Sequence, residues 1–406
     1  MRQLIKLILL LATPFIWGCG GGAPEVIAQA NTTEMHHVDF GFNITYLSRT
    51  AKYQSALDTL KKDGFKHVRA YEPFSPKLAP GNAKQLEMIK LITDRNLDLL
   101  LSISNFPYYM LEKSKRPNEI KELKPELYKR MMNYTNRHPP ADMAAYGKAM
   151  RKMVSAMDNE GLLNRIEFEL GNEPEAPRYF WGDRQLWNEV TDTLVQVLKT
   201  TGRPVYCCGF TSGFAHGLRG NAEFSDYLAN DPSTKDLGLS YHVYMHSGKG
   251  ELDLRVGPSI PMRQENIITE FGIYTWFKEE RIKKVHSDNY LLHLMHTLDM
   301  CAKNNITRVY LYPLMDYHKV KARFGLFDIN AKPKRSYEMV RTLNKVIKNG
   351  YQVVDSNRSI IVIGSEELIV WAEANIPDLG EHLQRIIGDS HGMSGSLSEG
   401  NWKILE

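Results

Sequence analysis

Cysteine is scarce in this chain of 406 residues, which contains only Cys19, Cys207, Cys208 and Cys301. The three that follow Cys19 do not make a disulfide framework, and no CxxC pair or histidine-rich spacing indicates a zinc site. Cys207 and Cys208 lie inside an apolar run, where buried free thiols are the expected state. The sequence therefore predicts neither a disulfide-stabilised fold nor a bound metal.

The sequence also lacks a long run of like charge. Its formal net charge is +4, and a notably basic stretch, residues 113–130, interleaves three acidic residues with the basic ones. A solvated helix face has this pattern, whereas nucleic-acid binding calls for a clustered basic patch. We therefore expect no nucleic-acid partner, and the 43% hydrophobic content predicts a soluble globular protein with a sizeable core.

The longest apolar run stands at the N-terminus. Arg2 and Lys6 precede residues 7–17, a run that is too short to span a bilayer as a stable helix and is typical of a secretory signal. The run ends at Cys19, and this end resembles the signal of bacterial lipoproteins, in which the cysteine becomes lipid-modified after cleavage. Trp17 departs from the small residue usual at its position, so ordinary secretion is the alternative.

The resemblance implies a signal over residues 1–19 and a tether over 20–35. We then expect the protein in the bacterial cell envelope, in contact with the membrane only through the lipid on Cys19, or else secreted.

From residue 36 onward, β-rich runs alternate with amphipathic stretches. The expected strands are residues 38–43, 66–71, 97–104, 165–170, 203–210, 238–244, 266–272 and 307–313. Several are continuously apolar, as parallel strands buried on both faces are. Eight strands with intervening helices favour a (β/α)₈ barrel over an open doubly wound sheet. No GxGxxG or P-loop pattern follows any of them, so we expect no nucleotide cofactor.

Two segments depart from this alternation. Residues 105–141 form a long insertion after the third strand, which predicts a lid or a substrate-binding wall. Residues 351–375 predict two or three antiparallel strands. We therefore expect a barrel over residues 36–348 and a small β-rich extension over 349–406.

Polar and aromatic side chains gather at the ends of the expected strands, where a barrel of this kind carries its chemistry. They are Arg69, Tyr71, Asn105, Asn172, Glu173, His242, Tyr244, Glu270, Tyr312 and Asp316. Glu173 ends the fourth strand and Glu270 the seventh, so the two carboxyls face each other across a closed barrel. Hydrolysis of a glycosidic bond requires such a pair, with one carboxyl protonated and the other ionised.

Four segments, in the right order, resemble the retaining glycosidases of glycoside hydrolase clan A. Residues 169–174, ELGNEP, contain the Asn-Glu-Pro signature, and residues 241–244, YHVY, match the His-x-Tyr of the sixth strand. Residues 268–273, ITEFGI, are similar to the nucleophile strand, and 324–340 to the run after the eighth strand. The resemblance implies a (β/α)₈ barrel that hydrolyses β-glycosidic bonds of a poly- or oligosaccharide by double displacement.

The resemblance also implies roles for individual residues. Glu173 would be the acid/base and Glu270 the nucleophile, while Asn172 would donate to the sugar 2-hydroxyl. Tyr244 would hold Glu270 in place through a hydrogen bond. Arg69 would lower the pKa of Glu270 through its charge.

His242 would line the same face of the barrel, and Asn105 would contact substrate. In many clan members a tryptophan follows strand eight as the sugar platform. This chain has Tyr310 and Tyr312 there, and we expect Tyr312 to contact substrate.

Structural alternatives stay open for several of these residues. Glu167 and Glu169 point to one face of their strand, and either is a candidate for a buried carboxylate paired with Arg69. His242 is equally a candidate core histidine, and Glu175 is a second candidate acid. The aromatic residues near the mouth, Trp181, Trp276, Tyr179, Phe180, Phe106, Tyr108 and Tyr109, suit either sugar stacking or packing.

Two further functions remain as alternatives to a monomeric glycosidase with a carbohydrate substrate. A transglycosylase would use the same covalent intermediate with a sugar acceptor. A carbohydrate-binding lipoprotein without catalysis would have no need of the paired glutamates and Tyr244.

The lipoprotein interpretation predicts the fate of a Cys19→Ala variant. Because the lipid would be attached to the Cys19 thiol, the variant should leave the membrane fraction and appear as a soluble or unprocessed form. Fractionation with immunodetection measures this, and Cys207→Ala and Cys208→Ala variants serve as controls that should fractionate like the wild type. A Cys19→Ala variant that stays with the membrane would leave plain secretion as the interpretation.

Overall fold

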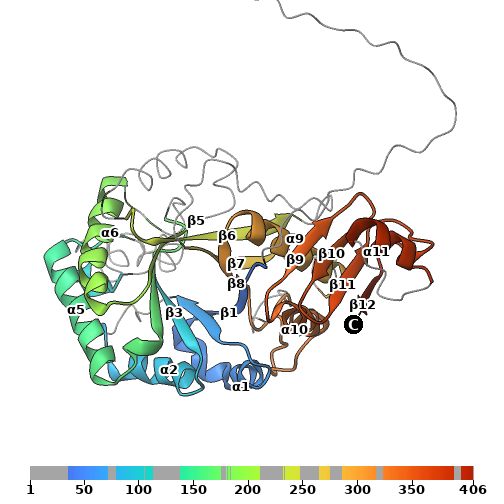
Figure 1. Ribbon diagram of the computed structural model, residues 1–406. Helices are drawn as coiled ribbons and strands as arrows, with labels where there is room; N and C mark the ends of the chain where they lie inside the picture. The colour runs from blue at the N-terminus through green and yellow to red at the C-terminus, as the bar shows by residue number, and fades with distance from the viewer. Residues whose placement is uncertain are drawn as a thin grey trace, which may run out of the picture.

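A computed structural model describes residues 35–71, 79–104, 106–112, 138–174, 180, 182, 184–210, 232, 234–246, 265–274, 286–316, 323–387 and 395–405. Its centre is a closed barrel of eight strands in chain order, with β8 paired to β1 (Figure 1). The strands are β1 (Asp39–Tyr46), β2 (His67–Tyr71), β3 (Asp98–Ile103), β4 (Ile166–Leu170), β5 (Val205–Phe210), β6 (Gly238–His246), β7 (Asn266–Tyr274) and β8 (Ile306–Leu311). The predicted barrel is confirmed.

Helices lie outside the strands and cover the barrel. They are α1 (Gln54–Lys62), α2 (Ala83–Thr93), α5 (Met143–Asn159), α6 (Arg184–Leu198), α9 (Asn289–Lys303) and α10 (Arg335–Ile347), with short 3₁₀ turns η1 (Leu47–Lys52), η2 (Tyr108–Met110), η5 (Leu163–Arg165) and η6 (Lys199–Thr201). In α5 the buried residues Tyr146, Met150, Met153 and Met157 recur at intervals of three and four, so they form one apolar stripe. Asp142 starts this helix by accepting from the Ala145 amide at 2.9 Å.

Side chains of β4 alternate between the helices and the barrel interior. Phe168 belongs to the apolar core, whereas Glu167 and Glu169 pair with arginines. Glu167 accepts from Arg308 of β8, and Glu169 accepts from Arg69 of β2 at 2.7 Å. Each glutamate is thus a barrel carboxylate paired with an arginine, which was one of the structural alternatives for Glu167 and Glu169.

The C-terminal extension is an antiparallel sheet of four strands in the order β12-β11-β10-β9. Its elements are β9 (Gln352–Asp355), β10 (Ser359–Ile363), β11 (Leu368–Ala372), α11 (Leu379–Ile387) and β12 (Trp402–Leu405). One face, with Ile360 and Trp371, joins the apolar core of the barrel. The other face, with Ile361 and Val370, packs with residues of α11. The predicted β-rich extension is confirmed, and β12 comes from the tail, which has no readable strand pattern.

Cys207 and Cys208 are joined by a disulfide, so the prediction of free thiols at these positions is wrong. Both residues are buried in β5. Spacing rules for disulfides rest on the separation between cysteines, and they give no signal for a bridge between neighbours in an apolar run. Cys301 is a buried free cysteine.

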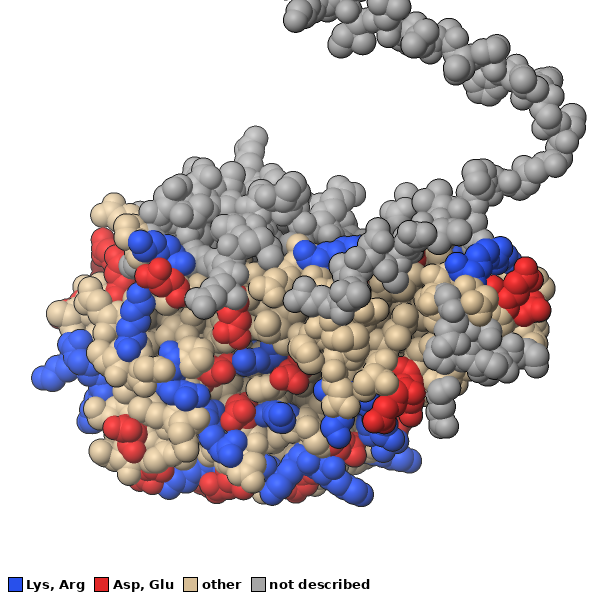
Figure 2. Space-filling model, viewed as in Figure 1, with Lys and Arg blue, Asp and Glu red and all other residues tan. Residues whose placement is uncertain are grey.

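The described surface carries charges of both signs. On the face shown in Figure 2, described Lys and Arg side chains are interspersed with Asp and Glu, without a patch of one sign covering the described surface in that view. In the described part of the chain, no helix has the length and apolar character needed to cross a membrane. The predicted signal, the tether up to residue 34 and most of the 105–141 insertion lie outside the described residues.

Candidate active site

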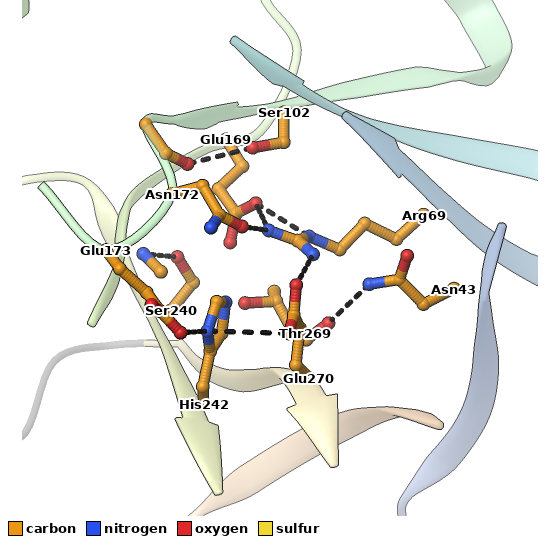
Figure 3. Close-up of polar contacts among 12 residues, drawn as sticks. Asn43, Arg69, Ser102, Glu169, Asn172, Glu173, Ser240, His242, Thr269 and Glu270 are labelled. Carbon is orange, nitrogen blue, oxygen red and sulfur yellow. Dashed lines mark hydrogen bonds and ion pairs between the residues drawn. The ribbon is translucent and has the colours of Figure 1, made fainter. Parts of the chain in front are cut away.

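Arg69 of β2 is the centre of a polar network inside the barrel (Figure 3). Its guanidinium donates from Nε to Glu169 Oε2 at 2.7 Å, from Nη1 to Glu270 Oε1 at 2.8 Å, and from Nη2 to Asn172 Oδ1 at 2.8 Å. Arg69 is 0% exposed. Burial disfavours the charged form, but the charges and hydrogen bonds of Glu169 and Glu270 outweigh it and raise the pKa of Arg69. The network therefore holds a permanent buried positive charge.

Glu270 lies on β7 with both carboxylate oxygens occupied. Oε1 accepts from Arg69, Oε2 accepts from the Tyr244 hydroxyl, and Oε2 also lies 3.7 Å from His242 Nδ1. Burial alone would raise the pKa of Glu270. The charges of His242 and Arg69 and the hydrogen bonds from Tyr244 and Arg69 together lower it instead. Glu270 is therefore ionised at neutral pH.

Glu173 stands just beyond the end of β4, opposite Glu270. Its Oε1 lies 2.9 Å from His242 Nδ1, and its backbone amide donates to the Gly209 carbonyl at 2.9 Å. Its φ is +50°, in the left-handed region that few residues other than glycine adopt. Such strained positions persist only when neighbours hold them, and they cluster at functional sites. Here the turn aims a carboxyl into the barrel mouth.

Gly171 makes this turn possible. A Cβ at this position would lie 2.4 Å from Cη2 of Trp187, and its φ of +83° is also left-handed. Its carbonyl accepts from the Ser102 hydroxyl at 2.8 Å, and its amide donates to the Ile103 carbonyl at 2.9 Å. The backbone conformation of this turn therefore requires glycine at position 171.

The two carboxylates approach closely. Oxygen atoms of Glu173 and Glu270 and a ring nitrogen of His242 all lie within 4.8 Å of one another. His242 is fully buried. Burial favours its neutral form, but the charge of Glu270 and the hydrogen bond and charge of Glu173 outweigh both burial and the charge of Arg69, so the pKa of His242 is raised.

The same three residues have ligand spacing suited to a metal ion. Two observations disfavour a divalent cation there. The Arg69 guanidinium already lies 2.8 Å from Glu270, and the raised pKa of His242 favours a protonated ring, whereas a metal needs it neutral. The geometry suits proton chemistry better than metal binding.

Aromatic side chains continue from Tyr244 along the mouth. The Tyr312 ring lies 6.2 Å from that of Tyr244, and the Phe324 ring lies 6.4 Å from that of Tyr312. Tyr310 instead lies deeper in the barrel, fully buried, with its hydroxyl 3.0 Å from Arg308. Tyr312 is therefore the tyrosine of strand eight that adjoins the carboxylates.

The structure brings most of the predicted residues together and sets some aside. Arg69, Asn172, Glu173, His242, Tyr244 and Glu270 form one connected cluster, with Tyr312 beside it. Asn105, Trp181, Trp276 and Glu175 lie outside the described residues. Phe106 and Phe180 are buried and pack on each other and on Tyr146 and Trp187, which favours packing for these two.

Sequence reasoning missed three residues that support the site, namely Asn43, Ser240 and Gly209. Asn43, in the middle of β1, donates to the Thr269 carbonyl at 3.3 Å and thereby holds the backbone next to Glu270. Ser240 of β6 accepts from the Gly209 amide at 2.8 Å. The only signal for Asn43 was a polar residue in an apolar strand, and neither Ser240 nor Gly209 gave any.

At the level of sequence, no described protein family and no curated protein matches the chain. Solved structures of glycoside hydrolases share its fold. A family 39 glycoside hydrolase of Bacteroides cellulosilyticus WH2 is 16% identical with a TM-score of 0.55, over 84% of this chain and 72% of that one. A family 30 endoxylanase of Clostridium papyrosolvens C71 is 15% identical with a TM-score of 0.54, over 84% and 83%. A Croceicoccus marinus glucosidase is 11% identical with a TM-score of 0.53, over 84% and 75%. The barrel is thus the fold of these enzymes, as the clan A resemblance implied.

The network predicts how Glu270 titrates in a Tyr244→Phe variant. The Tyr244 hydroxyl donates to the ionised carboxylate, so its loss should raise the pKa of Glu270. A hydrogen bond to a charged group contributes about 1.5–3 kcal/mol, enough for a clear shift. Carboxyl ¹³C NMR of protein labelled at glutamate measures it, with the Glu270 signal assigned from a Glu270→Gln variant. Tyr310→Phe, which removes another buried hydroxyl, should leave the Glu270 titration unchanged. An unshifted titration in Tyr244→Phe would contradict the account.

Proposed function

We propose that the protein is a retaining β-glycosidase of poly- or oligosaccharides, with Glu270 as the nucleophile and Glu173 as the acid/base. The observation that carries the proposal is the pair of facing carboxylates with different surroundings. Glu270 is buried against Arg69 and Tyr244, whereas Glu173 is partly exposed and bonded through its side chain to His242. One carboxylate is thus held ionised while the other can exchange a proton with substrate.

The separation of the carboxylates supports retention. Retaining enzymes hold the two carboxyls about 5–5.5 Å apart, and inverting enzymes hold them about 6.5–9.5 Å apart to admit a water. One oxygen of Glu173 lies within 4.8 Å of one oxygen of Glu270, which is closer to the retaining spacing than to the inverting one. Direct attack by Glu270 on the anomeric carbon is the step that this spacing favours.

The proposed reaction has two displacements. First, Glu270 attacks the anomeric carbon while Glu173 gives its proton to the departing glycosidic oxygen, so that a glycosyl-enzyme ester replaces the glycosidic bond. Water then attacks the same carbon, Glu173 takes the proton of this water, and Glu270 leaves as a carboxylate. Both groups return to their starting protonation states.

Neighbouring side chains prepare these steps. Asn172 Oδ1 accepts from Arg69, so its amide Nδ2 remains to donate to the sugar 2-hydroxyl. The Tyr244 hydroxyl holds Glu270 Oε2, which fixes the direction of attack. Tyr312 lies beside Tyr244, where a ring can contact the bound sugar.

A transglycosylase would share every group named here, and it remains the alternative outcome of the same intermediate. For the location of the protein, we propose the cell envelope, through a lipid on Cys19. Polysaccharides that are too large to enter the cell would meet the enzyme there.

Variants of the two glutamates separate their roles. Glu270→Ala lacks the group that forms the ester, so its activity should fall by several orders of magnitude on every substrate. Glu173→Ala should still form the ester from a dinitrophenyl β-glycoside, because this leaving group needs little protonation. The ester should then accumulate and the apparent KM should fall.

Azide rescue tests the same assignment through the product. Azide needs no base, so it should restore turnover of Glu173→Ala and give the β-glycosyl azide. With Glu270→Ala it should give the α-azide. NMR of the products distinguishes these outcomes. An α-azide from Glu173→Ala would reverse the two roles, and near-wild-type activity in either variant would remove that residue from the mechanism.

A further inference from the structure

Two buried polar atoms without a hydrogen-bond partner face each other across Gly209 of β5. A Cβ at this position would lie 3.2 Å from Glu169 Oε1 and 3.2 Å from His242 Nε2, with Asn172 Cα at 3.5 Å. Within the described part of the chain, neither Glu169 Oε1 nor His242 Nε2 makes a hydrogen bond. Both atoms thus border the side of Gly209 that carries no side chain, between the Arg69 network and the His242–Glu173 pair, and we call this position the Gly209 recess.

The backbone around this recess is held in place. The Gly209 amide donates to Ser240 Oγ at 2.8 Å, and the Gly209 carbonyl accepts from the Glu173 amide at 2.9 Å. The φ of Gly209 is +62°, and the pairing of β5 with β6 shifts register between Cys207 and Phe210.

The recess has the polarity for one water molecule. Its two polar atoms lie at most twice 3.2 Å apart, and they do not bond directly. A water with two hydrogen bonds of about 2.8 Å bridges polar atoms at separations within this limit, and buried waters occupy sites that offer polar partners of this kind.

Water also matches both protonation states of His242. The Glu169 carboxylate only accepts hydrogen bonds. When His242 is neutral with its proton on Nδ1, Nε2 accepts, and the water can donate to both atoms. When His242 is charged, Nε2 donates to the water, which still donates to Glu169. A direct contact between Glu169 and Nε2 would be repulsive when the neutral ring carries its proton on Nδ1.

We propose that the Gly209 recess holds one water that links His242 to Glu169, which makes Glu169 a positioning residue for the acid/base. This rests on the proposed function, because it assigns Glu173 as the acid/base. A continuous hydrogen-bonded path then runs from Glu173 through His242, the water, Glu169 and Arg69 to Glu270. No proton moves along this path when His242 changes charge, because only the water reorients.

The consequence concerns which oxygen of Glu173 carries the transferable proton. With the proton of the neutral ring on Nδ1, 2.9 Å from Glu173 Oε1, the Nδ1–H of His242 points at this oxygen in both states of the ring, so Oε1 always accepts. The proton for the leaving oxygen must then sit on Oε2. The groups that face His242 are Glu173, Glu270, Arg69, Tyr244 and, through the recess, Glu169.

Two measurements on the wild-type protein test the linkage without any activity assay. A high-resolution crystal structure should show a water within hydrogen-bonding distance of both Glu169 Oε1 and His242 Nε2. Long-range ¹H–¹⁵N NMR of histidine-labelled protein, assigned with His242→Gln, should show the proton on Nδ1 in the neutral ring. An empty recess, or a neutral ring protonated on Nε2, would overturn the proposal.

The variant Glu169→Gln tests the coupling. It keeps the size of the side chain and removes its charge, so the pKa of His242 should fall. The kcat of the variant should decrease about tenfold, and the basic limb of its pH profile should move. The matched control is Glu167→Gln, two residues earlier on β4 and paired with Arg308, which should leave both the His242 titration and the pH profile unchanged.

The outcomes separate this inference from the proposed function. If His242 titrates alike in wild type and Glu169→Gln while the wild type hydrolyses β-glycosides, the inference alone falls. If the His242 titration shifts as expected but no β-glycoside is cleaved, the linkage stands and the proposed function falls. Should Glu169→Gln fail to fold, the wild-type crystal structure and the NMR assignment of the His242 proton still decide the question.

Discussion

The buried guanidinium of Arg69 is the interaction on which the site depends. It joins three strands by bonding to Glu169 and Asn172 at the end of β4 and to Glu270 on β7. A lysine would not replace it, because only the planar guanidinium directs donors along three fixed directions. Removing one partner of a buried ion pair costs about 3–5 kcal/mol, because the other charge is left uncompensated. The network is therefore a structural tie across the barrel, and together with the charge of His242 it keeps Glu270 ionised.

The fold supplies what this network needs. Only a closed barrel brings side chains of β2, β4 and β7 together in a space free of bulk water. Deeper in the barrel, Glu167 and Arg308 form a second layer with an ion pair of their own. Two layers of paired charges thus fill an interior that apolar residues usually fill. Only the layer around Arg69 lies at the mouth, where Glu173 and His242 add two more titratable groups.

Much of this could be predicted from the sequence because strand order and strand ends leave clear patterns. Continuously apolar strands between helices predicted the barrel, and polar residues at strand ends marked Arg69, His242 and Glu270 in advance. Two interpretations of Arg69, as the partner of Glu169 and as the neighbour of the nucleophile, were posed as alternatives. The structure realises both, since one guanidinium has enough donors for each.

Other features depend on geometry that no pattern encodes. The disulfide between Cys207 and Cys208 arises between neighbours, where spacing carries no information. The recess at Gly209 lies at a register shift between β5 and β6. A single glycine in a strand does not predict such a shift. The tail strand β12 pairs with β11 across a long separation in sequence, so local periodicity did not reveal it.

The stereochemistry of hydrolysis tests the central claim most directly, because it reports whether Glu270 attacks the sugar or water does. Incubation of the protein with a β-linked oligosaccharide is followed by ¹H NMR from the first turnovers, before mutarotation. The account predicts that the β-anomer of the new reducing end appears first and then equilibrates with the α-anomer. Initial release of the α-anomer would contradict it, because inversion requires a water in place of the nucleophile.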